Sequence, residues 1–592
     1  MDPQILLTRL NIRAYIQTLT AFTCWLAVIP STLAAENRAL KRSDVVFMYD
    51  ADRQTYLDYG ATVLAWGGIP TPQSREAAAG VRLYGSVGMV TEFDQYYERF
   101  PKTYQQGLCR DVDGKPVKVP WLTDLQHKGI PYWWCCTSQP LFRQYLSERV
   151  VQTVRSGADG VHIDDHMGTA GGLWLGICFC DGCVDGFRGY LQTLGPDELR
   201  RLGVERVDQF NYRDKVKRWL ATGDARTPRQ VTQHPLWPQW TIYQCRAAAK
   251  WMQELSELAA RTAGRTVPIG ANAGLLWPRH LSDYRTLDLF SAETDHHASD
   301  RTPTDLPLVA YRMADAVQRP YAATASGGDW AFIKEKNLPG LVRCWIALSY
   351  AAGHCFMAPH RQWCYTPEKG THWYDGPREK FAPLYQFVRR NADLFDEYEA
   401  YTDVGIVLPY RAFTRDAERW FDICSQLAAR NISYQLLLGG DEIVGHPLSA
   451  ERLNACRAVL IPDREDLQVA DRRLVEQRTT KGACFNTVAE ALRQVAPAVR
   501  IEAKGQVRAL PRVKPGSAVI HLLNYRYNPA GDDVRPLPGV RVQLDLSALG
   551  VTGAKTCRWV TPDADPVELP ISGDTVLVPT LNLWGLLEMS AE

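Results

Sequence analysis

The sequence predicts a (β/α)8 barrel followed by a small flavodoxin-like α/β domain and a C-terminal β-sandwich, and three observations lead to the barrel. Short apolar runs alternate with amphipathic helical segments from residue 44 to about 398. One run, 160–165, ends in Asp164-Asp165. The motif Cys178-Phe-Cys180-Asp-Gly-Cys183 follows in the next loop. Repeated strand–helix units form such barrels, whose chemistry lies at the carboxyl ends of the strands.

Eight apolar runs are expected to be the barrel strands. They span residues 45–50, 81–89, 130–136, 160–165, 267–272, 287–293, 321–325 and 354–357. Helical patterns such as 141–156 and 243–263 separate them. Strands alternating with helical segments in this way predict a parallel sheet with helices outside it. The barrel is therefore assigned to residues 36–400.

Two smaller regions follow the barrel. Residues 401–500 contain the strand-like runs 403–409, 434–438 and 458–462, each linked by a helix, which predicts a parallel α/β domain. This region contains no G-x-C-x-G or G-x-S-x-G motif, so its expected role is structural or oligomeric. Residues 501–592 have only strand signals between turns rich in Gly, Pro and Asp, which predicts the β-sandwich.

The first 35 residues have the pattern of a secretion signal. Arg9 and Arg13 precede an apolar run at 19–30, and small residues end at Ala35 before Glu36. The run is short for a membrane span. We therefore expect cleavage near Ala35 and a secreted or periplasmic protein without a membrane segment; an uncleaved anchor is the alternative.

Charge and composition restrict the class of partner. The chain has 67 Lys+Arg against 66 Asp+Glu and no basic stretch, so nucleic acid is not an expected partner. Eighteen Trp and 26 Tyr supply rings on which sugars stack, although large cores would also use them.

The cysteines indicate a structural metal. Most of the 15 lie singly in apolar segments and are expected to be core residues. Cys178, Cys180 and Cys183 are close enough to bind one ion, and a tetrahedral zinc site needs a fourth ligand. Cys136 is the predicted fourth ligand, with Cys135 or Cys109 as alternatives. The alternative to a zinc site is a disulfide or a set of free thiols. No cofactor is expected for catalysis.

Two carboxylates are the predicted catalytic pair. Val161 and Ile163 take the helix-facing side of their strand, so Asp164 points into the barrel. By the same alternation Glu293 ends the sixth strand and faces inward. Glycosidic cleavage requires two such groups across the bond. Asp165 is a further catalytic candidate, and capping of a strand end or binding of an Arg is the structural alternative for each.

Other polar and aromatic residues at the predicted strand ends are candidates for binding a sugar, through stacking of rings and hydrogen bonds to hydroxyls. Packing within the core is the alternative for each of them. The candidates are Tyr49, Asp50, Trp66, Trp134, His162, His166, Asn272, Trp277, Asp295, His296, Trp330, His360, Arg361 and Trp363.

The order barrel, α/β domain, β-sandwich, with C-x-C-x-x-C after strand four, resembles the glycoside hydrolase family 42 β-galactosidases. The stretch from Asp159 to His166 (DGVHIDDH) is similar to the D-G-[IV]-H-[FIL]-D-D motif of uncharacterised glycosidase-like barrels. Family 42 has Asn-Glu on strand four and Glu on strand seven, whereas this chain has Asp164-Asp165 and no carboxylate near Ala325.

The resemblance implies a glycoside hydrolase acting on oligo- or polysaccharide, with Asp164 as nucleophile and Glu293 as acid/base in a retaining mechanism. It also implies a homodimer or homotrimer through the α/β domain. A non-catalytic glycan-binding barrel and a uronic-acid lyase or epimerase are the alternatives, and Arg361 and the histidines would matter most in the latter.

Overall fold

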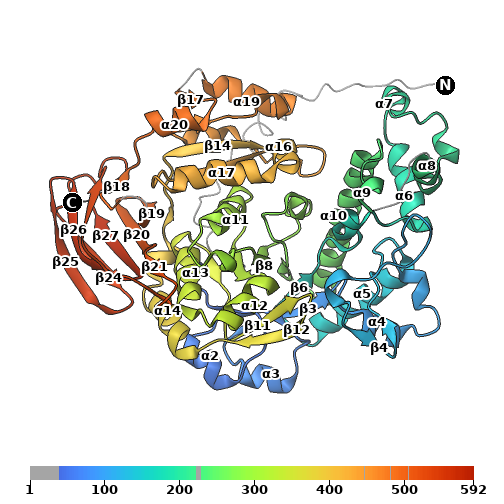
Figure 1. Ribbon diagram of the computed structural model, residues 1–592, viewed down its shortest axis with the longest axis horizontal. Coiled ribbons are helices and arrows are strands. Elements are labelled where there is room, and N and C mark those ends of the chain that lie inside the picture. Colours follow the sequence, from blue (N-terminus) through green and yellow to red (C-terminus); the bar gives the residue numbers. More distant parts are fainter. Residues whose placement is uncertain (1–38, 222–227, 446, 480–481, 504–505, 592) are drawn as a thin grey trace, which may run out of the picture. The chain divides into compact units, whose positions relative to one another are not determined.

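The computed structural model describes residues 39–591 except 222–227, 446, 480–481 and 504–505 (Figure 1). Within it, eight parallel strands form one sheet in chain order. They are β1 (Val46–Phe47), β2 (Val63–Gly67), β3 (Arg82–Gly88), β6 (Gly160–Asp164), β7 (Ile269–Ala271), β8 (Leu289–Thr294), β9 (Tyr321–Ala325) and β10 (Cys355–Phe356). The predicted signal peptide lies outside the described residues, so its cleavage stays a prediction.

The sheet closes on itself. The backbone N–H of Ala358, two residues after β10, donates to the carbonyl of Val46 at 2.7 Å. Phe47 and Ala358 also form a parallel bridge between the first and last strands. The predicted (β/α)8 barrel is therefore confirmed, and the carboxyl ends of all eight strands meet at one rim.

One predicted barrel strand is wrong and another was missed. Residues 130–136 do not enter the barrel, because β5 (Ile130–Pro131) pairs only with β4 (Gln126–His127) in an antiparallel hairpin. Lys128 and Gly129 both have positive φ between the two strands, the geometry of a two-residue hairpin turn. Strand β2 takes the second barrel position instead. Since one error offsets the other, β6 and β8 remain the fourth and sixth strands.

Helices connect the barrel strands and pack on the outside of the sheet. They include α2 (Arg53–Tyr59), α3 (Pro72–Ala77), α4 (Phe93–Arg99), α5 (Pro140–Arg155), α10 (Trp237–Ala263), α11 (Leu306–Ala316), α12 (Gly327–Lys336), α13 (Pro339–Ala351) and α14 (Arg378–Arg390). The connection from β6 to α10 also carries η3 (Gly168–Leu175), α6 (Asp181–Leu191), α7 (Pro196–Arg201), α8 (Tyr212–Leu220) and α9 (Pro228–Val231). This insertion follows Asp164 directly, and α6 begins within the cysteine motif.

A second parallel sheet follows the barrel. Its strand order is β15 (Tyr434–Gly439), β14 (Val404–Pro409), β16 (Ala458–Leu460) and β17 (Ala483–Phe485). Numbered along the chain this is the order second, first, third, fourth, as in flavodoxin-like sheets. Helices α17 (Ala417–Ala428) and α19 (Val469–Thr479) belong to the same region. The predicted flavodoxin-like domain is confirmed as a fold, and its oligomeric role stays a prediction.

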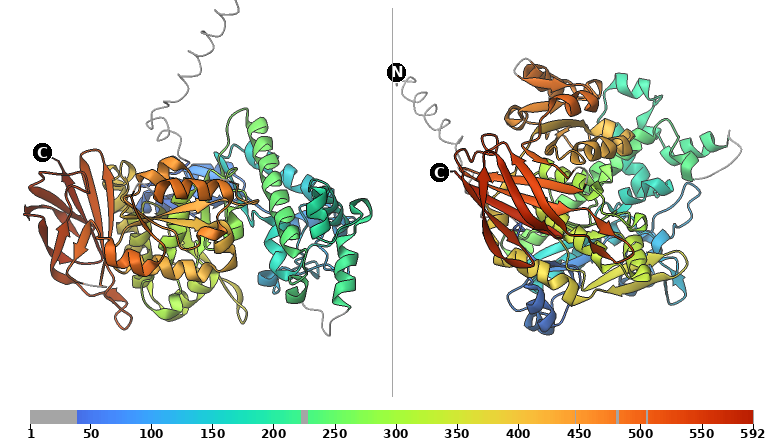
Figure 2. Two further views of the ribbon diagram at one scale, coloured as in Figure 1. Left: turned by 90° about the horizontal axis from the view of Figure 1, so that it is seen from above. Right: turned by 60° about the vertical axis from the view of Figure 1, so that its left-hand side comes forward.

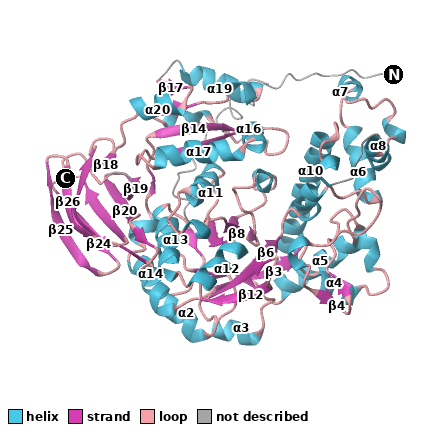
Figure 3. Cartoon of the chain, in the orientation of Figure 1, coloured by secondary structure: helices cyan, strands magenta, loops and turns pink. Residues whose placement is uncertain are grey.

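The C-terminal region consists of strands, as the cartoon in Figure 3 shows. Its main strands are β19 (Val507–Lys514), β20 (Ser517–Asn524), β23 (Leu537–Leu544), β24 (Thr556–Thr561), β25 (Ala564–Ser572), β26 (Thr575–Leu581) and β27 (Trp584–Ser590), all paired antiparallel. They run side by side in red in Figure 2. Buried Ile520 and Leu522 of β20 share one core with Val542 of β23 and Val578 of β26, which confirms the predicted β-sandwich.

The predicted domain boundary at 400/401 falls at the end of one strand of this C-terminal sheet, and the boundary at 500/501 falls within another. Strand β13 (Glu399–Ala400) pairs with β19, and β18 (Val499–Ile501) pairs with β23. No helix among the described residues is long and apolar enough to cross a membrane.

Candidate active site

The two predicted catalytic carboxyl groups lie beside a shared amide. Asn272, which follows β7, donates from Nδ2 to Oδ1 of Asp164 at 3.1 Å. Its Oδ1 accepts the backbone N–H of Glu293 at 3.2 Å. Since β7 lies between β6 and β8 in the barrel, Asn272 spans the two strands that carry the acids. The barrel therefore places Asp164 and Glu293 on either side of one fixed side chain.

Asp164 is held by two further hydrogen bonds. Val161 and Ile163 are fully buried on the helix side of β6, so the alternation of the strand turns Asp164 to the interior. Thr91 Oγ1 donates to Asp164 Oδ2 at 3.2 Å, and the backbone N–H of Asp165 donates to Oδ1 at 3.0 Å. Burial raises the pKa of Asp164, and the bonds from Asn272, Thr91 and Asp165 oppose that rise. Each of these donors favours the ionised carboxylate.

For Glu293, the effects that raise the pKa outweigh the hydrogen bonds that lower it. Burial, and then the charge of Asp164, raise its pKa to about 8. The bonds from Asn272 and from the backbone N–H of Gly327 oppose the rise only in part. Glu293 therefore carries a proton at neutral pH. Two neighbouring carboxyl groups whose environments separate their pKa values are the arrangement expected of an acid and its ionised partner.

Asp165 and Asp295 complete the group of acids. Asp165 adopts a left-handed backbone conformation with φ of +51°, uncommon for a residue other than glycine. Burial raises its pKa well above the ordinary value, and the charges of Asp164 and Glu293 raise it further. Burial and the charge of Asp329 raise the pKa of Asp295. Asp165 is thus electrostatically coupled to both members of the pair.

Aromatic residues from β1 and β2 flank the acids. Tyr49 follows β1, and burial raises the pKa of its hydroxyl well above the ordinary value, with further contributions from Glu293 and Asp164. Its ring meets Trp66 edge-on at 6.4 Å. Trp66 is half-buried and donates from Nε1 to the carbonyl of Ser291 at 3.0 Å. Both predicted residues therefore lie at the rim with the carboxyl pair.

Trp277 is an exposed ring close to Glu293. Its side chain is 63% exposed. A Cβ on Gly274 would lie 2.9 Å from the carbonyl oxygen of Glu293 and 3.5 Å from Cδ1 of Trp277, so the indole borders the end of β8. Among the remaining predicted binding residues, Asp50 and Arg361 are exposed, and His360 and Trp363 are partly exposed.

Three predicted binding histidines are buried, which corrects their assignment. His162 Nδ1 lies 2.8 Å from Ser291 Oγ, and its ring stacks on Trp66 at 4.5 Å inside the barrel. His166 Nδ1 lies 2.8 Å from Asp283 Oδ2. His296 Nδ1 lies 2.6 Å from the carbonyl of Thr294, beside Trp345. None of the three is more than 1% exposed, so none presents its ring at the surface of the site.

Two predicted binding tryptophans are also core residues. Trp134 and Trp330 are each 1% exposed. Trp134 Nε1 donates to the carbonyl of Gly168 at 3.2 Å, and Trp330 Nε1 donates to Thr324 Oγ1 at 3.0 Å. Their polar atoms are satisfied inside the protein, as buried tryptophans require.

The sequence analysis missed three residues of the site. Thr91 and Gly327, which contact the two acids, each lie just beyond a predicted strand and carry no charge to draw attention. Trp373 lies on a hairpin after β10, and its ring meets Tyr49 at 5.2 Å. The position of Thr91 and Gly327 directly after a strand was the available signal.

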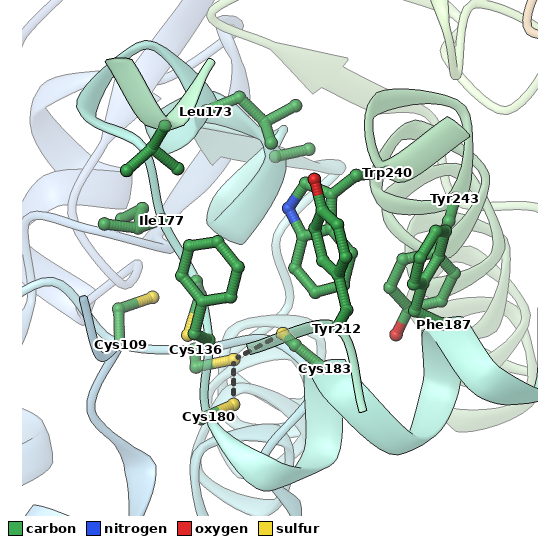
Figure 4. Packing of buried hydrophobic residues seen from close by; sticks show 14 of the residues in the cluster. Cys109, Cys136, Leu173, Ile177, Cys180, Cys183, Phe187, Tyr212, Trp240 and Tyr243 are labelled. Carbon is green, nitrogen blue, oxygen red and sulfur yellow. Dashed lines mark hydrogen bonds between the residues drawn. The ribbon is translucent and has the colours of Figure 1, made fainter. Parts of the chain in front are cut away.

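The four predicted metal-binding cysteines converge, and Figure 4 shows three of them, Cys136, Cys180 and Cys183. Cys136 Sγ lies 3.5 Å from Cys180 Sγ and 3.6 Å from Cys183 Sγ, and the sulfur atoms of these three and Cys178 all lie within 4.8 Å of one another. Tetrahedral zinc with four thiolates needs sulfur atoms about 3.8 Å apart. All four are buried, and the described cysteines form no disulfide.

Neighbouring donors also fit thiolate ligands. The backbone N–H of Arg110 donates to Cys178 Sγ at 3.2 Å, and that of Ser138 donates to Cys136 Sγ at 3.4 Å. Hydrogen bonds of this kind orient metal ligands and stabilise their charge. Cys135 Sγ instead faces the carbonyl of Trp133 at 3.7 Å. The donor set therefore fits a structural zinc ion held by Cys136, Cys178, Cys180 and Cys183.

Known proteins resemble this chain in part. No family model matches the sequence. An α-agarase from Thalassotalea agarivorans is 25% identical over 617 residues, which is 95% of this chain and 41% of that protein. The chain thus spans about two fifths of the length of this relative.

Two solved structures share the fold. A β-galactosidase from Bacillus circulans sp. alkalophilus has a TM-score of 0.60 at 11% identity, covering 92% of this chain and 99% of that one. A catalytic mutant of a GH42 β-galactosidase from G. stearothermophilus has a TM-score of 0.59 at 9% identity, covering 92% and 98%. The predicted similarity in architecture to family 42 is therefore confirmed.

The raised pKa of Glu293 predicts how the stability of the protein depends on pH. The folded state keeps this proton up to about pH 8, whereas an ordinary Glu releases it near 4.5. Rising pH between these values therefore favours the unfolded state. In Glu293→Gln this loss is absent, so the variant should gain stability relative to wild type across the window, by at most roughly 1.4 kcal/mol per pH unit.

Thermal unfolding of both proteins at several pH values measures the difference. Parallel curves of Tm against pH would show that Glu293 titrates as an ordinary exposed carboxyl group.

Proposed function

We propose that this chain is a glycoside hydrolase that cleaves a polysaccharide by a retaining, two-carboxylate mechanism. The observation that carries the proposal is the pairing of a protonated Glu293 with a hydrogen-bonded Asp164 across Asn272. A proton donor and an ionised carboxylate at the rim of a barrel are the two groups that glycosidic cleavage needs.

In the first step Asp164 attacks the anomeric carbon while Glu293 gives its proton to the glycosidic oxygen. The bond to the leaving sugar breaks with its electron pair on that oxygen, and a glycosyl ester of Asp164 remains. Asn272, Thr91 and the N–H of Asp165 orient the attacking carboxylate. Proton transfer to the leaving oxygen by a positioned acid contributes about 10²- to 10⁴-fold to the rate.

In the second step Glu293 takes a proton from water, which attacks the anomeric carbon and releases Asp164. The ester has no charge, so the contribution of Asp164 to the pKa of Glu293 disappears in the intermediate. The pKa of Glu293 then falls, which suits its change from acid to base. The electrostatic coupling of the pair thus serves both halves of the reaction.

The relative suggests the substrate. Because the matched relative is an α-agarase, we propose an agar-type polysaccharide as the substrate. The chain matches only 41% of that protein, so a panel of other polysaccharides and aryl glycosides belongs in the test.

Asp164→Asn and Glu293→Gln should each lower the release of reducing ends from the active substrate by at least about 100-fold. Asp164→Asn removes the attacking oxygen's charge, and Glu293→Gln removes the proton donor. Matched controls are Asp197→Asn and Glu198→Gln on the surface helix α7, which should leave activity unchanged. Product configuration followed by NMR should show retention at the anomeric carbon.

Near-native activity in either catalytic variant, at native Tm, would remove that residue from the mechanism and direct attention to Asp165. Inversion of configuration would contradict the nucleophilic role of Asp164.

Asp295→Asn should shift the alkaline limb of the kcat profile to lower pH. The charge of Asp295 helps to raise the pKa of Glu293, so its removal lowers that pKa and Glu293 loses its proton earlier. Profiles of kcat against pH for the variant and wild type measure the shift. An unchanged limb, or one displaced to higher pH, would mean that Glu293 is not the acid that controls it.

We also propose that the four cysteines bind one structural zinc ion, supported by their spacing and by the N–H donors to sulfur. Purified protein should contain about one zinc per chain by elemental analysis, and Cys180→Ser should lose it with a lower Tm. Cys344→Ser, which alters a buried cysteine outside the cluster, should retain the metal. Protein without zinc whose cysteines react as free thiols or as disulfides would contradict this proposal.

A further inference from the structure

A hairpin after the last barrel strand presents aromatic side chains on its outer face. Strands β11 (Arg361–Thr366) and β12 (Gly370–Asp375) are antiparallel (Figure 1). Trp363 pairs with Trp373 and Tyr365 with Thr371, so these four side chains project from one face.

The opposite face of the hairpin packs on the barrel. Gln362, Cys364 and Tyr374 are buried there, Thr324 Oγ1 donates to Gln362 Oε1 at 2.8 Å, and Trp330 stacks on Tyr374 at 5.4 Å. The outer face would ordinarily be polar, because antiparallel sheets alternate apolar residues inward with polar residues outward. Here it carries half-buried aromatic rings instead, named the hairpin platform: Trp363, Tyr365 and Trp373.

Contacts within the face hold these rings in place. Trp363 and Tyr365 stack at 5.7 Å with planes only 14° apart. Trp363 Nε1 donates to Thr371 Oγ1 at 3.4 Å. The guanidinium of exposed Arg361 lies over the Trp373 ring at 4.5 Å. Rings fixed before a ligand arrives lose little conformational entropy when they bind it.

The platform begins at the proposed catalytic pair. Trp373 meets Tyr49 at 5.2 Å, and Tyr49 lies within electrostatic reach of both Glu293 and Asp164. A Cβ on Gly327 would lie 2.5 Å from Cζ3 of Trp363, while the Gly327 N–H bonds Glu293. A glycan bound at the acids is therefore in reach of both tryptophans.

We propose that the hairpin platform binds successive sugar units of a glycan chain on one side of the bond that is cleaved, so that the substrate is a chain of several pyranose units. This rests on the proposed hydrolase function for the position of the cleaved bond. The apolar faces of the sugars stack on the three rings, and Arg361 donates hydrogen bonds to their oxygens. The binding of several units makes the reaction rate depend on chain length.

The test compares the polysaccharide with the shortest oligosaccharide that wild type cleaves. Tyr365→Ala and Trp373→Leu should lower kcat/KM for the polymer by about 5- to 10-fold or more, and by less for the short chain, so that the ratio of the two falls. Leu57→Ala removes an apolar side chain that is 58% exposed on α2 and should leave the ratio unchanged. Native Tm in each variant excludes misfolding, including in Tyr365→Ala, which also loses the hydrogen bond from the Tyr365 hydroxyl to the carbonyl of Pro120.

An unchanged ratio in both variants at native Tm would overturn the platform while leaving the hydrolase proposal intact. If wild type cleaves no glycan, affinity electrophoresis in gels containing agar-type polysaccharide replaces the kinetic readout. Retardation of wild type that is lost in Tyr365→Ala would support the platform without hydrolysis. Equal retardation of the two proteins, or none of either, would overturn it.

Discussion

The site depends on the repulsion between two half-buried carboxyl groups, Asp164 and Glu293, which disfavours the state in which both are ionised. Burial raises the pKa of each, and the charge of Asp164 adds to the rise at Glu293. Hydrogen bonds decide which of the two keeps its charge. Asp164 accepts from three donors and is thereby favoured as the ion, so Glu293 holds the proton. The Asn272 side chain links the two residues, because it donates to the carboxylate of Asp164 and accepts the backbone N–H of Glu293.

The barrel supplies the geometry that makes this division reliable. Strand pairing sets Asp164 beside Gly88 at the end of β3 and Glu293 beside Thr324 in β9, so each acid is flanked by neighbouring strand ends. Thr91 follows β3 and Gly327 follows β9, and each bonds one acid. The donors are therefore fixed by the same register that fixes the acids. A preorganised site of this kind requires little rearrangement during reaction.

Strand periodicity was enough to predict the barrel and the positions of Asp164 and Glu293 at its strand ends, because alternate residues of a strand point to opposite sides. The alternation does not indicate how deep inside the barrel an inward-facing side chain lies. His162 lies two residues before Asp164 on the same inward face, yet it is enclosed by Trp66 and Ser291. Its chemical type suggested substrate binding, but depth in a barrel depends on strand tilt and on the neighbours, which one strand's sequence does not reveal.

The missed features share another cause. Trp373 lies opposite Trp363 because β12 pairs with β11. This position depends on the register of the two strands. The run at 130–136 is apolar and strand-like, but the Lys128-Gly129 turn commits it to a local hairpin. The geometry of this turn, rather than the apolar pattern of residues 130–136, thus decides how the segment pairs.

The cysteine cluster lies close to the acids along the chain but contributes differently. Cys136 belongs to the connection between β3 and β6, and Cys178, Cys180 and Cys183 belong to the connection after β6. A zinc ion there would connect the two loops that border Asp164, within a buried cluster that also contains Phe179, Tyr212 and Trp240. Thr91, which donates to Asp164, lies in the same connection between β3 and β6 as Cys136. The metal would therefore stabilise the two connections that border the site, which also carry the Thr91 and Asp165 donors to Asp164.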